Sequence, residues 1–207
     1  MIAIVDHSGS DSRLLEEAFD RIGAAGETAQ SIERLHRASR IVVAGRGPYA
    51  PAARSLRDSG MIGSIVRAIT EGRPYLGIGF GLDLLFDVVH DGGQHTGLGI
   101  VPGKVSPLDY DPIHPVRRQC KVPHVGWTSV RWTSECPLLA GLSSGESFFF
   151  DHATHAQPLD DREALAFASH GRDIAAVVGS GRAFGTQFIP HKSQTAGLQV
   201  LHNFAGL

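Results

Sequence analysis

The sequence has little cysteine: Cys120 and Cys136 are the two among its 207 residues. Two cysteines at this spacing form neither a disulfide framework nor a zinc motif, so we expect two reduced thiols. The eleven histidines are scattered and show no HExxH-type spacing. The sequence therefore gives no support for a metal site, and we expect no cofactor.

An excess of charge of one sign is also lacking. The chain has 19 basic and 21 acidic residues, so its net charge is 19 − 21 = −2 with histidine neutral. Without a basic stripe, nucleic acid is not an expected partner. The apolar runs are too short to span a membrane, and residues 1–6 lack the charged start of a signal peptide. We expect a cytoplasmic protein with no membrane partner.

What is present is an ordinary globular composition, with 42% hydrophobic and 19% charged residues. No long linker divides the chain, so we expect a single domain over 1–207. The first half alternates short apolar runs with stretches of helical spacing, which indicates a parallel sheet with helices on both faces. The strands are expected at 2–5, 41–44 and 74–78, and the helices at 10–22, 52–58, 61–71 and 82–89.

The second half, from 97 to 188, is richer in short strands and turns. Strands are expected at 148–150, 164–168, 175–178 and 184–188, and residues 195–204 are expected to form a closing helix. Taken together, these patterns predict an α/β fold with a mixed, mostly parallel sheet flanked by helices.

A glycine-rich turn lies between the strand at 74–78 and the following helix: Gly77-Ile78-Gly79-Phe80-Gly81. This is the pattern of a nucleophile elbow, whose central residue sits in a strained backbone conformation at a helix N-terminus. That central residue should be Ser or Cys. Here it is Gly79, which has no side chain. Because glycine-rich turns also occur for packing alone, the motif by itself is a weak signal.

The motifs around this turn resemble those of the class I glutamine amidotransferases, closest to the glutaminase subunit of imidazole glycerol phosphate synthase. RPYLGIGFGLDLLF at 73–86 is similar to the family's KPFLGICLGMQLLF. The further blocks, in order, are IVD at 4–6 for the opening strand, AGRG at 44–47 for PGVG, GIVPGKV at 99–105 for GLIPGKV, PHVGW at 123–127 for PHMGWN, FFDH at 149–152 for YFVHS and FGTQFIPHKS at 184–193 for FGTQFHPEKS. The resemblance implies the flavodoxin-like fold of that family.

In the family, as the resemblance implies, a Cys attacks the glutamine amide, a His acts as base and acid, and a Glu orients the His. Backbone N–H groups hold the oxyanion, and ammonia passes to a partner (β/α)₈ cyclase barrel. All three triad positions are changed in this sequence: they are Gly79, Ile189 and His191.

The surroundings of the triad also depart from the family's pattern. The position of a substrate-holding Gln is Asp83, beside which we place His152 in the pocket. In the oxyanion region, Gly45 is followed by Arg46 in place of an apolar residue, and Phe80 follows the elbow residue. We expect Arg46 and Asp83 to pair across the pocket and block it.

Our leading hypothesis is a non-catalytic, amidotransferase-like subunit that binds a cyclase-like (β/α)₈ barrel, or associates with itself, as scaffold or regulator. Trp127 is the candidate partner-facing residue, with ordinary core packing as the alternative interpretation.

A second hypothesis is an enzyme with new chemistry in the old pocket, using His191, His152, Asp83 and Arg46. The alternative interpretation is that His191 fills the space that the Glu leaves. A relocated nucleophile would be Cys120 or Cys136, but neither lies at a strand-to-helix elbow. A third hypothesis is a working glutaminase whose motifs align differently, but no Cys precedes a Gly in an elbow-like turn.

Overall fold

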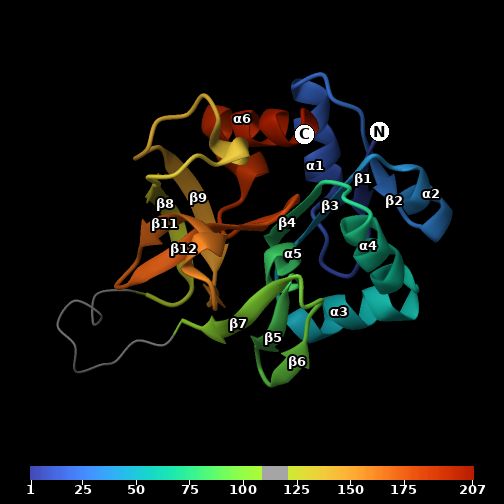
Figure 1. Cartoon of the computed structure of the whole chain (residues 1–207), viewed down its shortest axis with the longest axis horizontal. Coiled ribbons are helices and arrows are strands. Elements are labelled where there is room, and N and C mark those ends of the chain that lie inside the picture. The colour runs from blue at the N-terminus through green and yellow to red at the C-terminus, as the bar shows by residue number, and fades with distance from the viewer. Residues whose placement is uncertain (109–120) are drawn as a thin grey trace.

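A computed structural model describes residues 1–108 and 121–207 of the chain (Figure 1). Cys120 lies outside the described residues. The main feature is a nine-stranded sheet with the order β2-β1-β3-β4-β13-β12-β11-β8-β9. Its strands are β1 (Ile2–Val5), β2 (Gly26–Ala29), β3 (Arg40–Gly45), β4 (Tyr75–Gly79), β8 (His124–Arg131), β9 (Ser147–His152), β11 (Ala164–Ser169), β12 (Asp173–Ser180) and β13 (Ala183–Thr186).

This sheet is mixed, as expected from the change of pattern along the sequence. The pairs from β2 through β1, β3 and β4 to β13 are parallel. The pairs from β13 through β12, β11 and β8 to β9 are antiparallel. The predicted α/β fold with a mixed sheet flanked by helices is confirmed, and the parallel pairing is concentrated in the half that carries the elbow.

Helices cover both faces of the parallel half because alternate side chains of its strands point to opposite faces. In β1, Ala3 and Val5 belong to one hydrophobic cluster, whereas Ile2 and Ile4 belong to the other. The first cluster is covered by α2 (Ile32–Arg37), α3 (Tyr49–Asp58) and α4 (Met61–Thr70), and the second by α1 (Ser12–Arg21) and α6 (Gln194–Ala205) (Figure 1).

The helix predicted at 82–89 is wrong. One turn, α5 (Phe80–Asp83), follows β4, and the chain then forms a strand, β5 (Phe86–His90). This strand pairs with β7 (Val101–Pro107) and β6 (Gln94–Thr96), and with β10 (Thr154–Pro158) they form a second sheet of order β10-β7-β5-β6. The leucines at helical spacing misled the prediction, because the aromatic and β-branched residues after them suit a strand once a partner strand is available.

Three short 3₁₀ turns complete the described elements: η2 (Pro137–Leu139), η3 (Asp161–Glu163) and η4 (Pro190–Lys192). Helix α1 follows Asp11, whose carboxylate makes no capping hydrogen bond because it is engaged elsewhere. Across 1–108 and 121–207, no helix is long and apolar enough to cross a membrane.

Candidate functional site

The elbow lies where β4 ends and α5 begins, in the middle of the sheet (Figure 1). Gly79 has φ +58° and ψ −111°, a conformation that strains any residue with a side chain. A Cβ on Gly81 would lie 1.9 Å from the carbonyl oxygen of Val43, so β3 and α5 approach each other closely at that glycine. The glycines therefore keep the geometry of a nucleophile elbow.

The space where a side chain at position 79 would lie is restricted. A Cβ added to Gly79 would lie 2.6 Å from the carbonyl oxygen of Gly45, at the end of β3. Real Cβ atoms do not approach an oxygen so closely. A cysteine at position 79 therefore requires the end of β3 to move.

Ile189 and His191, the other two positions that the resemblance equates with the triad, make structural contacts. Ile189 is buried, and its backbone N–H donates to the carbonyl of Phe149 at 2.8 Å. His191 lies on η4 with its side chain 1% exposed, and its Nε2 atom is 3.5 Å from Oδ2 of Asp11. His191 thus packs against a carboxylate instead of orienting a catalytic base.

Arg46 links two carboxylates from opposite sides of the elbow. Its Nε and Nη2 donate to the two oxygens of Asp11, each at 3.2 Å, and its Nη1 donates to Oδ2 of Asp151 on β9 at 3.4 Å. Burial would raise the pKa of the Asp11 carboxyl, but the neighbouring His191 and the hydrogen-bonded Arg46 outweigh it and hold that pKa well below its usual range. The expected pairing of Arg46 with Asp83 is wrong, because these two acidic residues satisfy the guanidinium instead.

A cavity of about 290 Å³ opens beside the elbow. Its walls come from the ends of β3, β4 and β9 and from α5, so segments far apart in the sequence meet there. Arg46, Asp83 and His152, three of the four residues of the proposed new site, line it. The fourth, His191, is not among the lining residues. Gly45, Gly79 and Phe80 of the predicted elbow and oxyanion region line it as well.

Asp83 is the buried acid among those that line this cavity. It is 8% exposed, and its Oδ2 accepts a hydrogen bond from Thr154 Oγ1 at 3.3 Å. Burial raises the pKa of the Asp83 carboxyl to about 8, with the Thr154 hydrogen bond acting against the shift. Its Oδ1 has no hydrogen-bond partner among the described residues, and the same holds for Oε1 of Gln187, another lining residue.

The profile of the class I glutamine amidotransferase family matches residues 5–206. The chain belongs to this family. It is 34% identical to the imidazole glycerol phosphate synthase subunit HisH of Syntrophotalea carbinolica, with all of both chains covered. The identity to the HisH subunit of Salinibacter ruber is 35%, covering all of this chain and 94% of the relative.

Solved structures share the amidotransferase fold at lower identity. A structure described as glutamine amidotransferase superposes with a TM-score of 0.75 at 18% identity, covering 100% of this chain and 99% of the other. PurLQS from Thermotoga maritima gives a TM-score of 0.74 at 16% identity, covering 99% and 97%. At these identities the structural similarity shows the fold alone.

A chain of histidines adjoins the cavity of this amidotransferase family member. His152 Nδ1 donates to the carbonyl of Thr154 at 2.6 Å, so its Nε2 accepts from His124 Nδ1 at 2.9 Å. His124 Nε2 then accepts from Thr128 Oγ1 at 2.8 Å. Burial lowers the pKa of His152 to about 4 and, with the neighbouring His152 and His170, that of His124 to about 3. Both imidazoles are neutral at pH 7.

Trp127 lies on the same strand as His124 but faces outward. It is 49% exposed, and its ring makes an edge contact with Phe149 at a centroid distance of 6.0 Å. Val125, two residues before it on β8, is 57% exposed. The alternative of ordinary core packing for Trp127 is therefore wrong, and β8 presents an apolar face.

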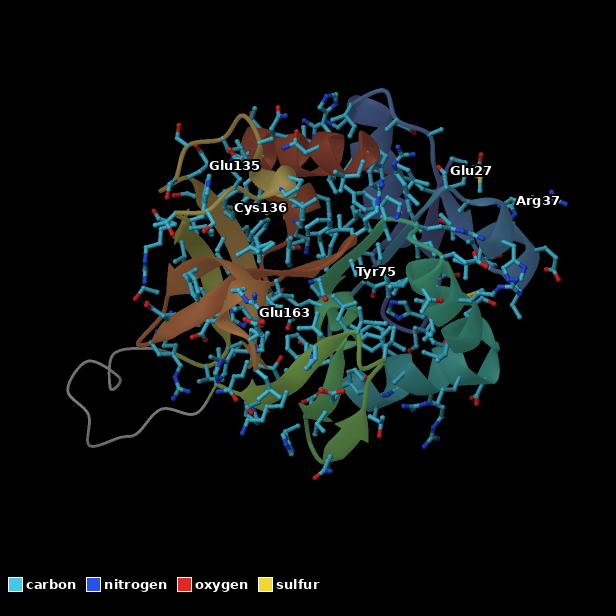
Figure 2. The ribbon with its side chains drawn as sticks, viewed as in Figure 1. Glu27, Arg37, Tyr75, Glu135, Cys136 and Glu163 are labelled. Atoms are coloured by element: carbon cyan, nitrogen blue, oxygen red, sulfur yellow. The ribbon has the colours of Figure 1, made fainter. Side chains whose placement is uncertain are left out.

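Cys136, the described thiol, is buried beside η2 and α6 and away from the elbow (Figure 2). Burial raises the pKa of the Cys136 thiol, which opposes formation of a nucleophilic thiolate. It lines a different cavity from Gly79. In the described ranges, no group of three or more His, Cys, Asp or Glu side chains could hold a metal ion.

Sequence reasoning missed Asp11, Asp151 and Gln187. One of them carried a usable signal: Asp151 stands in FFDH where the family's YFVHS has an apolar residue, just as Arg46 replaces an apolar residue in PGVG. Two apolar positions changed to opposite charges suggest a contact, and the two side chains do meet. Asp11 and Gln187 gave no such signal, because Asp11 lies outside the motif blocks and Gln187 is the residue that the family's block has at that position.

Proposed function

We propose that this chain is a non-catalytic amidotransferase-like subunit that binds a cyclase-like (β/α)₈ barrel and acts as its scaffold or regulator. The observation that carries the proposal is Gly79: the elbow is intact, and the position of the nucleophile has no side chain. Without the nucleophile and the base, catalysis falls by several orders of magnitude. We treat residues 1–207 as a single domain, and a cytoplasmic location stays a prediction.

The second support is the arrangement around Gly79. The guanidinium of Arg46 is held at the cavity by Asp11 and Asp151, and the Gly45 carbonyl oxygen faces the place of a side chain at position 79. A nucleophile side chain would need this space, and the carbonyl oxygen excludes it. The architecture favours a binding role over glutamine hydrolysis.

The partner is supported by the relatives and by the exposed face of β8. The relatives are named as subunits of imidazole glycerol phosphate synthase. Trp127 and Val125 expose apolar surface on β8, and aromatic residues are common anchors of protein interfaces. We propose that this face docks the barrel, with self-association through the same face as the alternative.

The deciding experiment measures glutamate release from glutamine by the purified chain, alone and mixed with a candidate barrel subunit. We expect no release above the uncatalysed rate in either case. Release that copurifies with the chain and survives substitution of Asp83 and His152 would contradict the non-catalytic proposal. A stable monomer that binds no barrel subunit would contradict the proposal that the chain has such a partner.

Repurposed chemistry is the second candidate function, and one observation favours it. The Asp83 carboxyl, with its pKa raised to about 8, is protonated at pH 7 and so is available as a general acid in the cavity. Arg46 and His152 line the same cavity. Crystals soaked with small polar metabolites test this candidate: a metabolite seated on these three side chains supports it, whereas an empty cavity favours the binding role.

A further inference from the structure

Three imidazole rings from separate parts of the large sheet pack against one another beside the elbow cavity. His124 lies on β8, His152 on β9, and His170 in the turn between β11 and β12. The rings of His124 and His170 are stacked, with their centroids 3.9 Å apart and their planes inclined by 15°. Nδ1 of His124 lies 2.9 Å from Nε2 of His152. One cluster of titratable side chains therefore joins β8, β9 and the β11–β12 turn.

The contact between His124 and His152 has room for one proton. The carbonyl of Thr154 can only accept a hydrogen bond, so Nδ1 of His152 carries a proton and donates it. Nε2 of His152 then accepts from Nδ1 of His124. If both rings were fully protonated, two N–H groups would face each other across 2.9 Å. The two rings therefore cannot both be imidazolium ions while this contact lasts.

The basic groups around the two buried rings also oppose a positive charge there. Burial is the largest cause of the lowered pKa of both rings, and His170 lowers it further. His155 of β10 acts on the His152 ring in the same direction. Nη1 of Arg172, from the same turn as His170, lies 3.3 Å from Nε2 of His155, and Lys104 of β7 adds positive charge near that ring. Each further proton in this region meets like charge.

The neighbouring acids do not balance a charge on the cluster. Asp151 precedes His152 on β9, so its side chain points to the other face of the sheet, where it pairs with Arg46. Asp83 accepts from the Thr154 hydroxyl, but burial raises its pKa to about 8, so it is neutral at pH 7 and below. In the described part of the chain, no acid raises the pKa of the two buried rings.

We propose that His124, His152 and His170 form a latch that holds β9 and the β11–β12 turn against β8 at neutral pH and opens locally in mildly acidic solution. Opening hydrates the rings and separates them, so that each can take up a proton that the packed arrangement excludes. Because the pKa of both buried rings lies below the ordinary 6.5, the closed latch loses stability as the pH falls below 6.5 and is unaffected above it.

The latch lies between two surfaces of the molecule. His152 lines the elbow cavity, and the Thr154 that accepts from it also donates to Asp83. His124 is on the strand that exposes Trp127. Opening therefore alters the cavity wall and the apolar face of β8 together. This is a property of the fold, and it holds whether or not the chain hydrolyses glutamine or binds a barrel.

The test is hydrogen–deuterium exchange of the full chain at pH 7 and pH 5.5, corrected for the pH dependence of intrinsic exchange. Protonation of an open ring with an ordinary pKa favours opening by about tenfold at pH 5.5, and by about a hundredfold for two rings. We expect at least a tenfold loss of protection at 124–128, 148–152 and 168–172, while 2–5 and 41–44 in the parallel half keep theirs. Unchanged protection would overturn the latch, and so would an equal loss in both regions, which indicates global unfolding.

His152→Gln separates proton uptake from packing. Its amide oxygen can accept from His124 and its N–H can donate to the Thr154 carbonyl, so the hydrogen bonds remain while one titrating ring is removed. We expect the loss of protection between pH 7 and pH 5.5 to become about tenfold smaller. His202→Gln, the same substitution at an exposed position on α6, should behave like the unchanged protein. The same loss of protection in both variants would overturn the latch.

A measurement on the unchanged protein keeps the latch testable if His152→Gln fails to fold. Long-range proton–nitrogen NMR spectra of histidine side chains distinguish the two neutral tautomers from the imidazolium ion. At pH 7 we expect both His124 and His152 to be neutral with the proton on Nδ1, as their hydrogen bonds require. An imidazolium ion at either ring at pH 7, with β8 still protected from exchange, would contradict the latch.

Discussion

The guanidinium of Arg46 lies 3.4 Å from the carboxylate of Asp151, at two positions where the amidotransferase motifs have apolar residues. Arg46 follows β3 and Asp151 is the next-to-last residue of β9, so the pair joins the parallel and antiparallel halves of the sheet beside the elbow. Asp11 holds the other edge of the same guanidinium.

This pair should be weakly stabilising. Arg46 and Asp151 are partly exposed, so a double-mutant cycle with Arg46→Met and Asp151→Val should give a coupling energy of about 0.5–1 kcal/mol in chemical denaturation. The control is a cycle on the more exposed Arg13–Glu17 pair of α1, where about 0.3 kcal/mol is expected. A coupling at Arg46–Asp151 no larger than at Arg13–Glu17 would show that the contact contributes no specific stability.

Gly79→Cys should fail to restore glutaminase activity. The base position is Ile189, and the new Cβ would meet the Gly45 carbonyl oxygen at 2.6 Å. We expect no glutamate release and a loss of stability of about 1–3 kcal/mol from the strained backbone and the close contact. Thermal melting and a glutamate assay measure the two effects.

Adding Ile189→His and His191→Glu to Gly79→Cys completes the triad and is the stricter version of this experiment. We expect this triple variant to stay far below a working amidotransferase while Arg46 and the Gly45 carbonyl remain in place. Glutamate release by Gly79→Cys alone would contradict this prediction, because it would mean that the absent side chain at position 79 is all that prevents hydrolysis.

Asp83 should make the protein less stable as the pH rises from 6.5 to 8. Burial raises its folded-state pKa to about 8, above an unfolded value near 3.8. Between these two pH values the folded chain binds more protons than the unfolded chain, so the contribution of Asp83 to the free energy of unfolding is greatest below about 3.8 and is lost as the pH rises toward 8. Urea unfolding should show this decline in the unchanged protein. Asp83→Asn should remove it, and the same decline in both proteins would assign it to another group.

The neutral histidines should have the opposite effect on stability, which should fall as the pH is lowered. The pKa values of His152 and His124 are lowered to about 4 and about 3, below an unfolded value of 6.5, so the unfolded chain binds more protons as the pH falls. Stability should therefore decrease below pH 6.5, by a few kcal/mol at pH 4. Measured in the Asp83→Asn background, His152→Gln should reduce this decrease, and His36→Gln on the exposed part of α2 should not.

Trp127→Ala should weaken binding of a barrel partner by tenfold or more while leaving the melting temperature nearly unchanged, because the ring is half exposed. Leu14→Ala removes a comparably exposed apolar side chain on α1 and serves as the control. Surface plasmon resonance against an immobilised barrel subunit gives both affinities. An equal, small loss of affinity from the two substitutions would show that the interface does not lie on β8.

The sequence by itself determined the parallel core and the elbow. A short run of buried apolar residues such as β3 is typical of a central strand of a parallel sheet. The spacing of the glycines around residue 79 indicates a tight turn with close backbone packing. The proposal that the nucleophile is lost likewise rests on a local feature, since Gly79 has no side chain in any environment.

Tertiary structure alone decided which groups meet at the elbow. The sequence suggested Arg46 with Asp83, whereas the guanidinium pairs with Asp11 and Asp151, from α1's N-terminus and β9. It suggested a helix at 82–89, whereas β7 and β6 supply the partners that make residues 86–90 a strand. Long-range pairing has no local signature, because its free energy comes from neighbours that only the folded chain brings together.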